Sequence, residues 1–233
     1  MSGILYMVAT PIGNLEDITY RAIRVLAEAS AIYAEDTRVS VKLLARYSLK
    51  VPLHSFREAA PRALVERTIS KITAELTEGK DLAFVSDAGT PGISDPGQYL
   101  VQRILEAGFN VVPIPGPSSQ STLLSIAGLP LYRTLCVGFL PKKKGHQTLL
   151  ERLRQALISE TADSILLLES PERVVALLKE VAQWELPLEV VLGRELTKRF
   201  EEVIRGSVDD ALNVLSSKPT IKGEITLLLY YRP

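Results

Sequence analysis

Short apolar runs alternate with longer amphipathic segments along the whole chain, and this alternation constrains the fold more than any other feature of the sequence. In the first half it predicts strands at 4–9, 31–34, 82–85 and 111–114, with helices at 17–29 and 62–77. Asp95 and Pro96 suit an N-cap and a first helical position, so a further helix is expected to begin there. Such alternation is typical of α/β proteins with mainly parallel sheets.

The second half of the chain repeats this pattern. It predicts strands at 134–139, 164–168, 188–192 and 224–230, with helices at 118–127, 147–158, 171–183 and 208–216. Strand signals lie closer together after residue 188, which predicts a mixed sheet there. The proline-rich run 113–117 can continue neither kind of element. Because 233 residues suffice for two small domains, we expect one at 1–115 and another at 116–233.

Three loops rich in glycine and proline directly follow predicted strands of the first domain, at 10–14, 88–92 and 115–119. Ligands of open α/β sheets bind beyond the carboxyl ends of the strands, so these loops are expected on one sheet edge. Glycine lets backbone amides approach a ligand closely, and proline keeps a loop rigid. Any one of these loops is equally well explained as a turn, but three on one edge favour a ligand site.

Charged residues also follow predicted strands. Asp87 lies between a strand and the second loop, where its carboxylate can accept hydrogen bonds from a ribose diol or an ammonium group, or simply stabilise a turn. Segment 34–38 brings two acids and a base to the same edge, and segment 194–198 follows a strand of the second domain. Segment 34–38 fits either a ligand site or the salt-bridged start of a helix. Segment 194–198 fits either a charged surface facing the cofactor loops or structural glutamates with solvated basic residues.

The composition argues against several classes of site. Lys plus Arg equals Asp plus Glu at 27 each, so any anionic partner must be held by a local patch, of which Lys142–Lys144 is the densest. His54 and His146 lie far apart with no Cys/His cluster near either, which argues against a metal site. Cys136 lies in an apolar run and is expected to be a buried thiol.

No apolar run approaches the length of a transmembrane helix, and no signal peptide is visible. We therefore expect a soluble cytoplasmic protein with no membrane partner. The Walker pattern, a G-x-G-x-x-G loop after the first strand and a G-x-S-x-G elbow are all missing from the sequence. The sequence therefore disfavours a P-loop, a dinucleotide-binding Rossmann site and a serine hydrolase.

The loop sequences resemble those of the tetrapyrrole (corrin/porphyrin) methylase superfamily and, within it, the enzymes that methylate small-subunit ribosomal RNA. The resemblance runs from residue 4 to about residue 229, with the motifs in the same order and spacing. Its most specific motif is Ser86-Asp-Ala-Gly-Thr-Pro-Gly-Ile-Ser-Asp-Pro-Gly97. The other motifs lie at 9–19, 35–38, 115–118 and 194–198.

The resemblance implies two α/β domains with S-adenosyl-L-methionine in the cleft between them, a homodimer and no metal. It also implies 2′-O-methylation of a cytidine ribose in the decoding region of 16S rRNA. The cofactor-binding positions on this view are Pro11, Gly13, Asp87, Gly89, Thr90, Pro91, Ser118, Glu169, Ser170, Leu196 and Gly223. The catalytic candidates are Lys198, Glu195 and Arg194, with Glu35, Asp36 and Arg38 opposite them, and no single base is assigned.

The sequence departs from the family pattern in three places. Ala9 stands where the family usually has glycine, and Glu172 replaces a histidine in the run 169–173. The family's His-Glu-His-Asn-Glu stretch is reduced to Glu58. The residues that now surround this glutamate are Arg57, Ala59, Ala60 and Pro61. If the segment touches the acceptor, RNA specificity is altered, whereas the cofactor loops are intact.

Two other functions remain open at this point. One is C-methylation of a tetrapyrrole ring, which calls for a wide apolar trough with basic residues for the ring carboxylates. The other is a non-catalytic cofactor-binding sensor, given the altered segment at 55–61.

Overall fold

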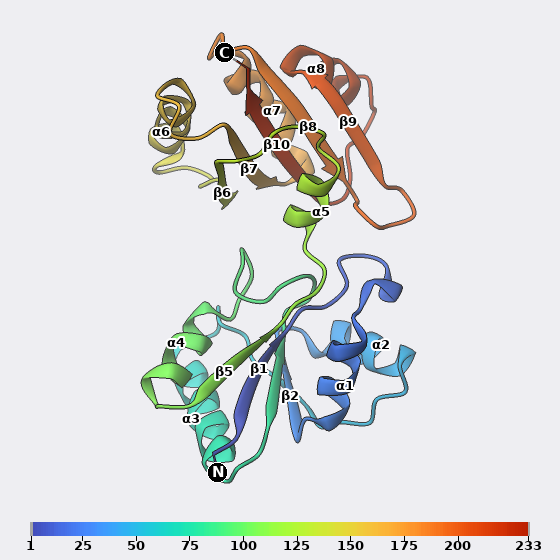
Figure 1. Ribbon diagram of the computed structural model, residues 1–233, viewed down its shortest axis with the longest axis vertical. Helices are drawn as coiled ribbons and strands as arrows, with labels where there is room; N and C mark the ends of the chain where they lie inside the picture. The colour runs from blue at the N-terminus through green and yellow to red at the C-terminus, as the bar shows by residue number, and fades with distance from the viewer. Residues whose placement is uncertain (1, 233) are drawn as a thin grey trace. The chain divides into compact units, whose positions relative to one another are not determined.

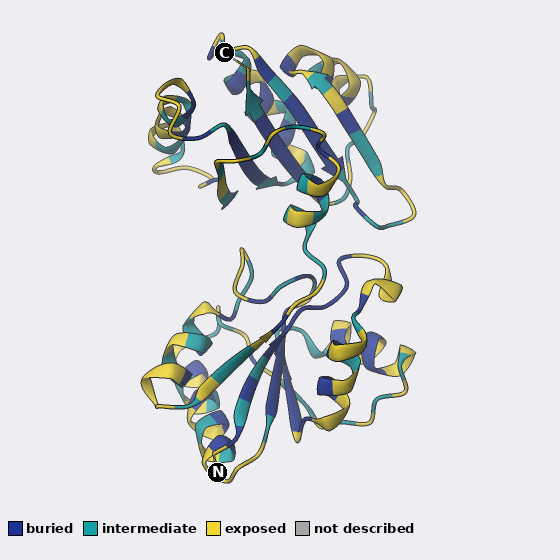
Figure 2. Cartoon of the chain, viewed as in Figure 1, coloured by how far each residue is buried: buried dark blue, intermediate teal, exposed yellow. Residues whose placement is uncertain are grey.

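A computed structural model describes residues 2–232 and divides them into two compact units, with the boundary between Ser118 and Ser119. Each unit has its own five-stranded sheet and its own core. Most of each sheet is buried, and the helices are exposed on their outer faces (Figure 2). The α/β class expected from the alternating pattern is confirmed for both units.

The first unit is a parallel sheet with helices on both faces (Figure 1). Its strand order is β3-β2-β4-β1-β5. The strands are β1 (Ile4–Val8), β2 (Ala31–Ala34), β3 (Leu53–Ser55), β4 (Leu82–Val85) and β5 (Asn110–Ile114). Helices α1 (Tyr20–Glu28) and α2 (Thr37–Arg46) pack in one core cluster, and α3 (Arg62–Thr77) and α4 (Gln98–Glu106) pack in the other.

The second unit is a mixed sheet, as the closely spaced strand signals predicted. Its order is β6-β7-β10-β8-β9, in which β6 and β7 are parallel and the remaining pairs are antiparallel. The strands are β6 (Thr134–Phe139), β7 (Ser164–Glu169), β8 (Leu188–Arg194), β9 (Glu202–Ser207) and β10 (Ile225–Tyr231). Helices α6 (His146–Ile158), α7 (Pro171–Ala182) and α8 (Val208–Ser216) bury their apolar sides in one cluster, and α5 (Ser119–Ser125) contacts β8 and β10.

Some local predictions were wrong. Helix α4 begins at Gln98 rather than near Asp95, because the amide of Gly92 donates to the carbonyl of Pro96 and closes a turn ahead of the helix. The helix predicted at 17–29 starts only at Tyr20, where the Thr19 side chain caps it, and a 3-10 turn (Leu15–Asp17) comes before it. Helix α2 begins within segment 34–38, in agreement with the helix start that was one of its two interpretations, but its extent and the short strand β3 were not predicted.

Cys136 is exposed, which contradicts the expected buried thiol. It lies on β6, an edge strand, and the pairing of β6 with β7 shifts register between Cys136 and Gly138. An apolar run on a sheet edge can leave some of its side chains in solvent. Among the residues that the structure describes, no helix is long and apolar enough to cross a membrane.

Candidate functional site

The three glycine-proline loops of the first unit meet at one edge of its sheet, as predicted. Strands β1, β4 and β5 are parallel, and β1 lies between the other two, so their carboxyl ends lie side by side. Thr10 and Gly89 exchange two backbone hydrogen bonds of 2.9 Å, which join the first loop to the second. The Thr90 hydroxyl donates to the carbonyl of Pro117 at 3.2 Å, which joins the second loop to the third.

Close backbone packing explains the residues at two loop positions. Gly89 has a φ of +77°, a left-handed conformation that glycine adopts at little cost. A Cβ on Gly116 would lie 3.0 Å from the Cβ of Ala9, which is itself fully buried. The alanine that replaces the family's usual glycine at position 9 is therefore accommodated by a glycine in the third loop.

A pair of carboxylates lies beside these loops, where β2 and β4 end. The amide of Asp36 donates to Asp87 Oδ1 at 3.0 Å, and the amide of Asp87 donates to Glu35 Oε2 at 3.4 Å. Burial, together with the neighbouring charge of Asp87, raises the pKa of Glu35 above its usual value. Burial also raises the pKa of Asp87. These two groups therefore hold protons more readily than ordinary carboxylates.

Asp36 and Arg38 mainly interact with each other. The Asp36 carboxylate accepts hydrogen bonds from the side chain and the amide of Arg38, which lower its pKa to about 2. Asp36 is the N-cap of α2, and the Arg38 side chain is largely exposed. Both predicted catalytic residues thus lie at the expected sheet edge, but Asp36 is a poor proton acceptor.

Glu58 has a positioning role that the sequence did not reveal. It is the one acid of the family's His-Glu-His-Asn-Glu stretch that this chain keeps. Its carboxylate accepts hydrogen bonds from the amides of Gly97 and Tyr99, at the start of α4. These amides have no partner within the helix, so an acid at this place stabilises the helix start. Glu58 therefore holds the end of the 86–97 loop. Because it acts 39 and 41 residues along the chain, no local motif could have indicated the contact.

The site residues predicted in the second unit also gather at one end of their sheet. Ile225, the first residue of β10, pairs with Glu169 at the end of β7 and with Arg194 at the end of β8. Gly223 lies just before β10, and a Cβ there would be only 2.3 Å from the Cγ of Glu195. The segment 194–198 and the residues around 169 and 223 are therefore neighbours within this unit.

Glu169 is 2% exposed and forms an ion pair of 2.6 Å with Arg173, one turn into α7. Its carboxylate also accepts a hydrogen bond from the amide of Ser170, the N-cap of α7. The Arg173 side chain donates further to the carbonyl of Leu140, while its Nε finds no partner in the described part of the chain. The Glu169 side chain is therefore engaged within the protein, and its predicted contact with a cofactor remains a prediction.

Lys198 is a fixed cation. Its Nζ lies 2.9 Å from Glu195 Oε1 and 3.2 Å from Glu224 Oε2. Burial alone would lower the pKa of Lys198, but its hydrogen bonds to these acids and their charges outweigh burial and raise it. Burial opposes ionisation of Glu195 as well, yet the Glu224 amide and Lys198 lower its pKa overall. Neither group is suited to accept a proton, but Lys198 is suited to stabilise a developing negative charge.

The backbone around Lys198 is strained. Glu195 and Thr197 both have left-handed φ angles, of 52° and 66°. Leu196 between them is buried and packs against Gly193, where a Cβ would lie 2.9 Å from the Leu196 side chain. The Thr197 hydroxyl is buried with no partner among the described residues. Strain of this kind persists only where the surroundings fix the backbone, and it is common at functional sites.

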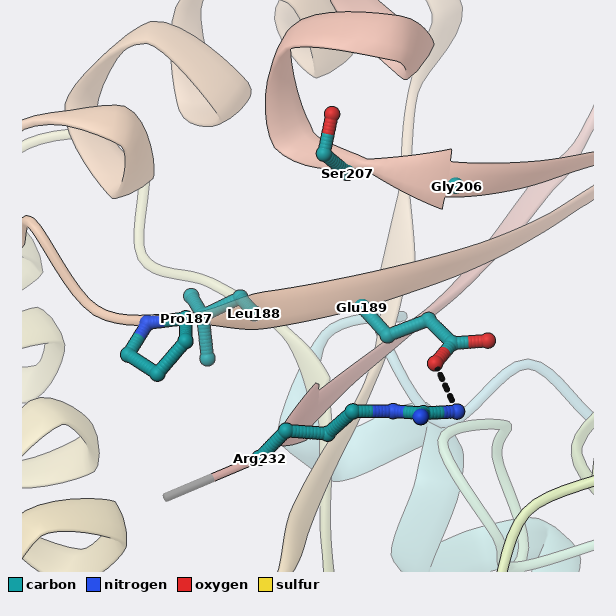
Figure 3. Close-up of a pocket in the computed structure, with 6 residues that line it drawn as sticks. All are labelled: Pro187, Leu188, Glu189, Gly206, Ser207 and Arg232. Atoms are coloured by element: carbon teal, nitrogen blue, oxygen red, sulfur yellow. Dashed lines mark ion pairs between the residues drawn. The ribbon is translucent and has the colours of Figure 1, made fainter.

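Arg194 belongs to a charged network at the same end of the sheet. It pairs with Glu202 at 2.8 Å, donates to the carbonyl of Lys222 at 3.0 Å, and shares Glu202 with Lys218. An open pocket of about 370 Å³ lies at the opposite end of β8, around Leu188, where Arg232 pairs with Glu189 (Figure 3). It includes none of the predicted site residues. Within residues 2–232 no group of His, Cys, Asp or Glu is suited to hold a metal.

A family model described as Tetrapyrrole (Corrin/Porphyrin) Methylases matches residues 4–212. The chain belongs to this methylase family. It is 42% identical to a protein named ribosomal RNA small subunit methyltransferase I from Borrelia garinii subsp. bavariensis, over 97% of this chain and 98% of that one. A protein of the same name from Thermotoga maritima is 40% identical, with coverage of 97% and 98%.

Solved structures of the methylase family share the fold. A uroporphyrin-III C-methyltransferase from Thermus thermophilus, described as complexed with S-adenyl homocysteine, aligns with a TM-score of 0.65 at 18% identity. The alignment covers 97% of each chain. The resemblance seen in the loop sequences is therefore confirmed, and the chain is a methyltransferase of this fold.

The residues of the first unit fit the methyl donor of this family. S-adenosylmethionine carries a sulfonium, an ammonium, a carboxylate and a ribose diol. Asp87 can accept from the diol or the ammonium, and the edge that it shares with Glu35 is acidic. Loops containing Gly89 and Gly116 bring the backbone close enough for amides to reach a carboxylate.

Proposed function

We propose that this methylase transfers the methyl group of S-adenosyl-L-methionine to the 2′-hydroxyl of a cytidine ribose in the decoding region of 16S rRNA, within the small ribosomal subunit. The observation that carries the proposal is the joining of three glycine-proline loops at one sheet edge beside Glu35 and Asp87. Nearly full-length likeness to proteins named ribosomal RNA small subunit methyltransferase I supports the acceptor.

Two sets of residues hold the cofactor in this proposal. In the first unit they are Pro11, Gly13, Asp87, Gly89, Thr90, Pro91 and Ser118, and in the second Glu169, Ser170, Leu196 and Gly223. The first set lies on loops tied together by backbone hydrogen bonds and by the Thr90 hydroxyl. The second set lies at the end of a sheet where β7, β8 and β10 meet.

The cofactor supplies an electrophilic methyl group, and the reaction is an in-line displacement. The ribose oxygen forms a bond to the methyl carbon as the sulfur–carbon bond breaks, and the hydroxyl proton leaves to a base. The protein must hold donor and acceptor in line, about 3–3.5 Å apart. Lys198, held as a cation by Glu195 and Glu224, stabilises the developing alkoxide. Of the candidate acids, Glu35 has a raised pKa and so suits the proton acceptor better than Asp36 or Glu195.

The RNA must be held through its phosphates. Lys142, Lys143 and Lys144 are exposed and form no ion pair among the residues that the structure describes. Their loop is fixed at both ends, by the buried Leu140 and by a hydrogen bond between His146 and the carbonyl of Pro141. A fixed loop with three free ammonium groups fits a phosphate contact better than a loose linker does.

The test is methyl transfer from labelled S-adenosylmethionine to intact small ribosomal subunits, to bare 16S rRNA and to a tetrapyrrole precursor. Label in the ribose of the subunit RNA supports the proposal. Label in the tetrapyrrole, or cofactor binding without transfer to any of the three acceptors, overturns it and favours a C-methyltransferase or a sensor respectively.

Two variants separate the roles assigned to the two units. Lys198→Ala is expected to lower kcat about 10²- to 10³-fold with little change in cofactor Kd, since it removes a group that acts on developing charge. Asp87→Ala is expected mainly to weaken cofactor binding. Lys179→Ala, at an exposed position of α7, is the matched control and should change neither. Full turnover and normal affinity in both site variants would show that the assignment is wrong.

We also propose that the enzyme works in the cytoplasm as a homodimer. The family resemblance supports this state, and light scattering on the purified chain tests it. A mass of about 51 kDa, twice that of one 25.6 kDa chain, is expected.

A further inference from the structure

The loop that joins β8 to β9 exposes an aromatic ring at its tip. We call residues 198–201 the hairpin tip. The loop extends beyond the sheet (Figure 1), and its end is exposed (Figure 2). The Phe200 side chain is 66% exposed, and the guanidinium of Arg199 lies 5.5 Å from the centre of its ring. A single exposed apolar residue is ordinary in a soluble protein, so the inference depends on how this one is held.

Hydrogen bonds within the loop hold the hairpin tip in one shape. The Thr197 amide donates to the Glu201 carboxylate, and the Glu201 amide donates to the carbonyl of Lys198 at 3.1 Å. The Lys198 amide donates to the carbonyl of Glu195 at 3.0 Å, and the Lys198 ammonium is paired with two acids. Phe200 is therefore presented to solvent by a fixed turn next to the group proposed to stabilise the reacting oxygen.

The charges around the hairpin tip fall into two classes. Arg194, Lys198 and Lys218 are all neutralised by glutamates of the same unit. Arg199 and Lys222, in contrast, have no acidic partner in the described part of the chain. Lys222 lies beside the base of the hairpin, because its carbonyl accepts a hydrogen bond from Arg194. An exposed ring and two unpaired cations at one end of a sheet match the chemistry of a nucleotide, which has a flat base and an anionic phosphate.

We propose that Phe200 is a stacking platform for an unpaired base of the RNA acceptor, and that Arg199 and Lys222 hold the adjoining phosphates. This inference rests on the proposed function and names the part of the site that grips the RNA. RNA with accessible bases is recognised largely by stacking on aromatic side chains and arginine planes. A base that has no neighbour to stack on in its own strand gains from a protein ring that replaces that neighbour.

The experiment compares three substitutions of Phe200 in the full-length protein. Phe200→Ala and Phe200→Leu are expected to raise the KM for small ribosomal subunits about 5- to 150-fold, the range found for loss of one base–aromatic stack. Phe200→Tyr keeps the ring and should restore the KM to near the wild-type value. Cofactor Kd and the unfolding temperature should be unchanged in all three. Tyr132→Ala removes an even more exposed ring from the same unit and is the matched control, expected to have no effect.

The cationic part is tested by salt titration. Arg199→Ala and Lys222→Ala should each weaken RNA binding and reduce the slope of log affinity against log salt by about 1. The stacking role is overturned if Phe200→Leu keeps the wild-type KM, or if Phe200→Ala changes the oligomeric state and leaves the KM for RNA unaltered. These outcomes test the stacking role when the wild-type enzyme methylates RNA in the same assay. A wild-type enzyme that transfers no methyl group to RNA overturns the proposed function, and the stacking role with it.

Discussion

The predicted site residues of the two units are held in place by different kinds of contact. In the first unit, backbone hydrogen bonds such as those between Thr10 and Gly89 tie the loops together. In the second unit, ion pairs such as Lys198–Glu195 and a strained backbone at Thr197 fix the corresponding segment. The first arrangement depends mainly on glycines and on backbone atoms. The second depends on charge, and it is therefore the one that substitution of a single ionisable group should disrupt.

The largest effect on stability is expected from the buried ion pair of the second unit. Glu169→Leu removes the carboxylate partner of the Arg173 guanidinium, whose Nε already lacks a partner among the described residues. Breaking a buried pair costs about 3–5 kcal/mol in the free energy of unfolding, and because the Arg173 side chain is 26% exposed, the lower end, about 3 kcal/mol, is expected here. Urea unfolding of the protein without cofactor measures it.

The control for this prediction is the double variant Glu169→Leu/Arg173→Leu, which removes both charges and should regain much of the loss. In the first unit, Arg24→Ala breaks an exposed pair with Glu28 and should cost no more than about 0.5 kcal/mol. A single variant as stable as the double would mean that the buried pair does not hold α7 in place.

In the first unit the most sensitive position is expected to be a glycine. Gly97 has a φ of +127°, and a Cβ there would lie 2.9 Å from Met7 and 3.0 Å from Phe84. Gly97→Ala therefore combines backbone strain with overpacking and should cost about 2–4 kcal/mol. Gly108 has a φ of +83° with open space around it, so Gly108→Ala should cost only about 1 kcal/mol. Equal losses in thermal or urea unfolding would show that the contacts with Met7 and Phe84 do not matter.

Elements with a regular apolar period could be predicted from the sequence. Elements whose apolar residues do not follow a regular period could not. Helix α3 lies at the predicted residues 62–77, because its stripe from Val65 to Leu76 is regular and buried. The extent of helix α2 was missed because Val39 and Val41 are exposed while Ser40 between them is buried, so the sequence does not show a helical period. The burial of these residues depends on tertiary packing, which local periodicity does not report.

The candidate site shows the same limit. The edge shared by the three loops followed from a general rule about the carboxyl ends of parallel strands. Two contacts of the site join distant segments. Glu58 caps α4 from 39 residues away, and Glu35 meets Asp87 across 52 residues. Spacing within a motif carries no information about such partners. The protonation behaviour of the acids therefore had to come from the structure.

The third prediction concerns strain in the second unit. A β-branched residue at a φ of 66° stores roughly 1–2 kcal/mol, so Thr197→Gly should relieve strain and change stability by less than about 1 kcal/mol once the added freedom of the unfolded chain is counted. Because the glycine also loosens the turn that carries Lys198, kcat is expected to fall. Glu160→Gly relieves a similar φ of 53° away from the site and should leave kcat unchanged. A Thr197→Gly enzyme with normal kcat would show that the strain has no catalytic role.

The smallest expected effect is the change in stability when one carboxylate is replaced by its amide, and this change has opposite signs in the two units. Folding raises the pKa of Asp87, so the folded state binds this proton more readily than the unfolded chain does. Ionised Asp87 therefore costs stability, a cost that is absent below the unfolded pKa and fully present above the folded one. Asp87→Asn should stabilise the protein by less than about 1 kcal/mol at pH 7, with the gain fading towards pH 3, while cofactor affinity falls.

Glu202 of the second unit is the opposite case, because its hydrogen bonds to Lys218 and Arg194 lower its pKa. A depressed pKa contributes stability above the unfolded value, and that contribution is lost as the pH falls through the folded value. Glu202→Gln should therefore destabilise the protein at pH 7 and approach the wild-type stability in acid. Urea titrations of both variants between pH 3 and pH 7 measure the two differences. If both variants changed the free energy of unfolding in the same direction at pH 7, the carboxylates of the two units would be held alike. The contrast between a site held by backbone contacts and a site held by charge would then fail.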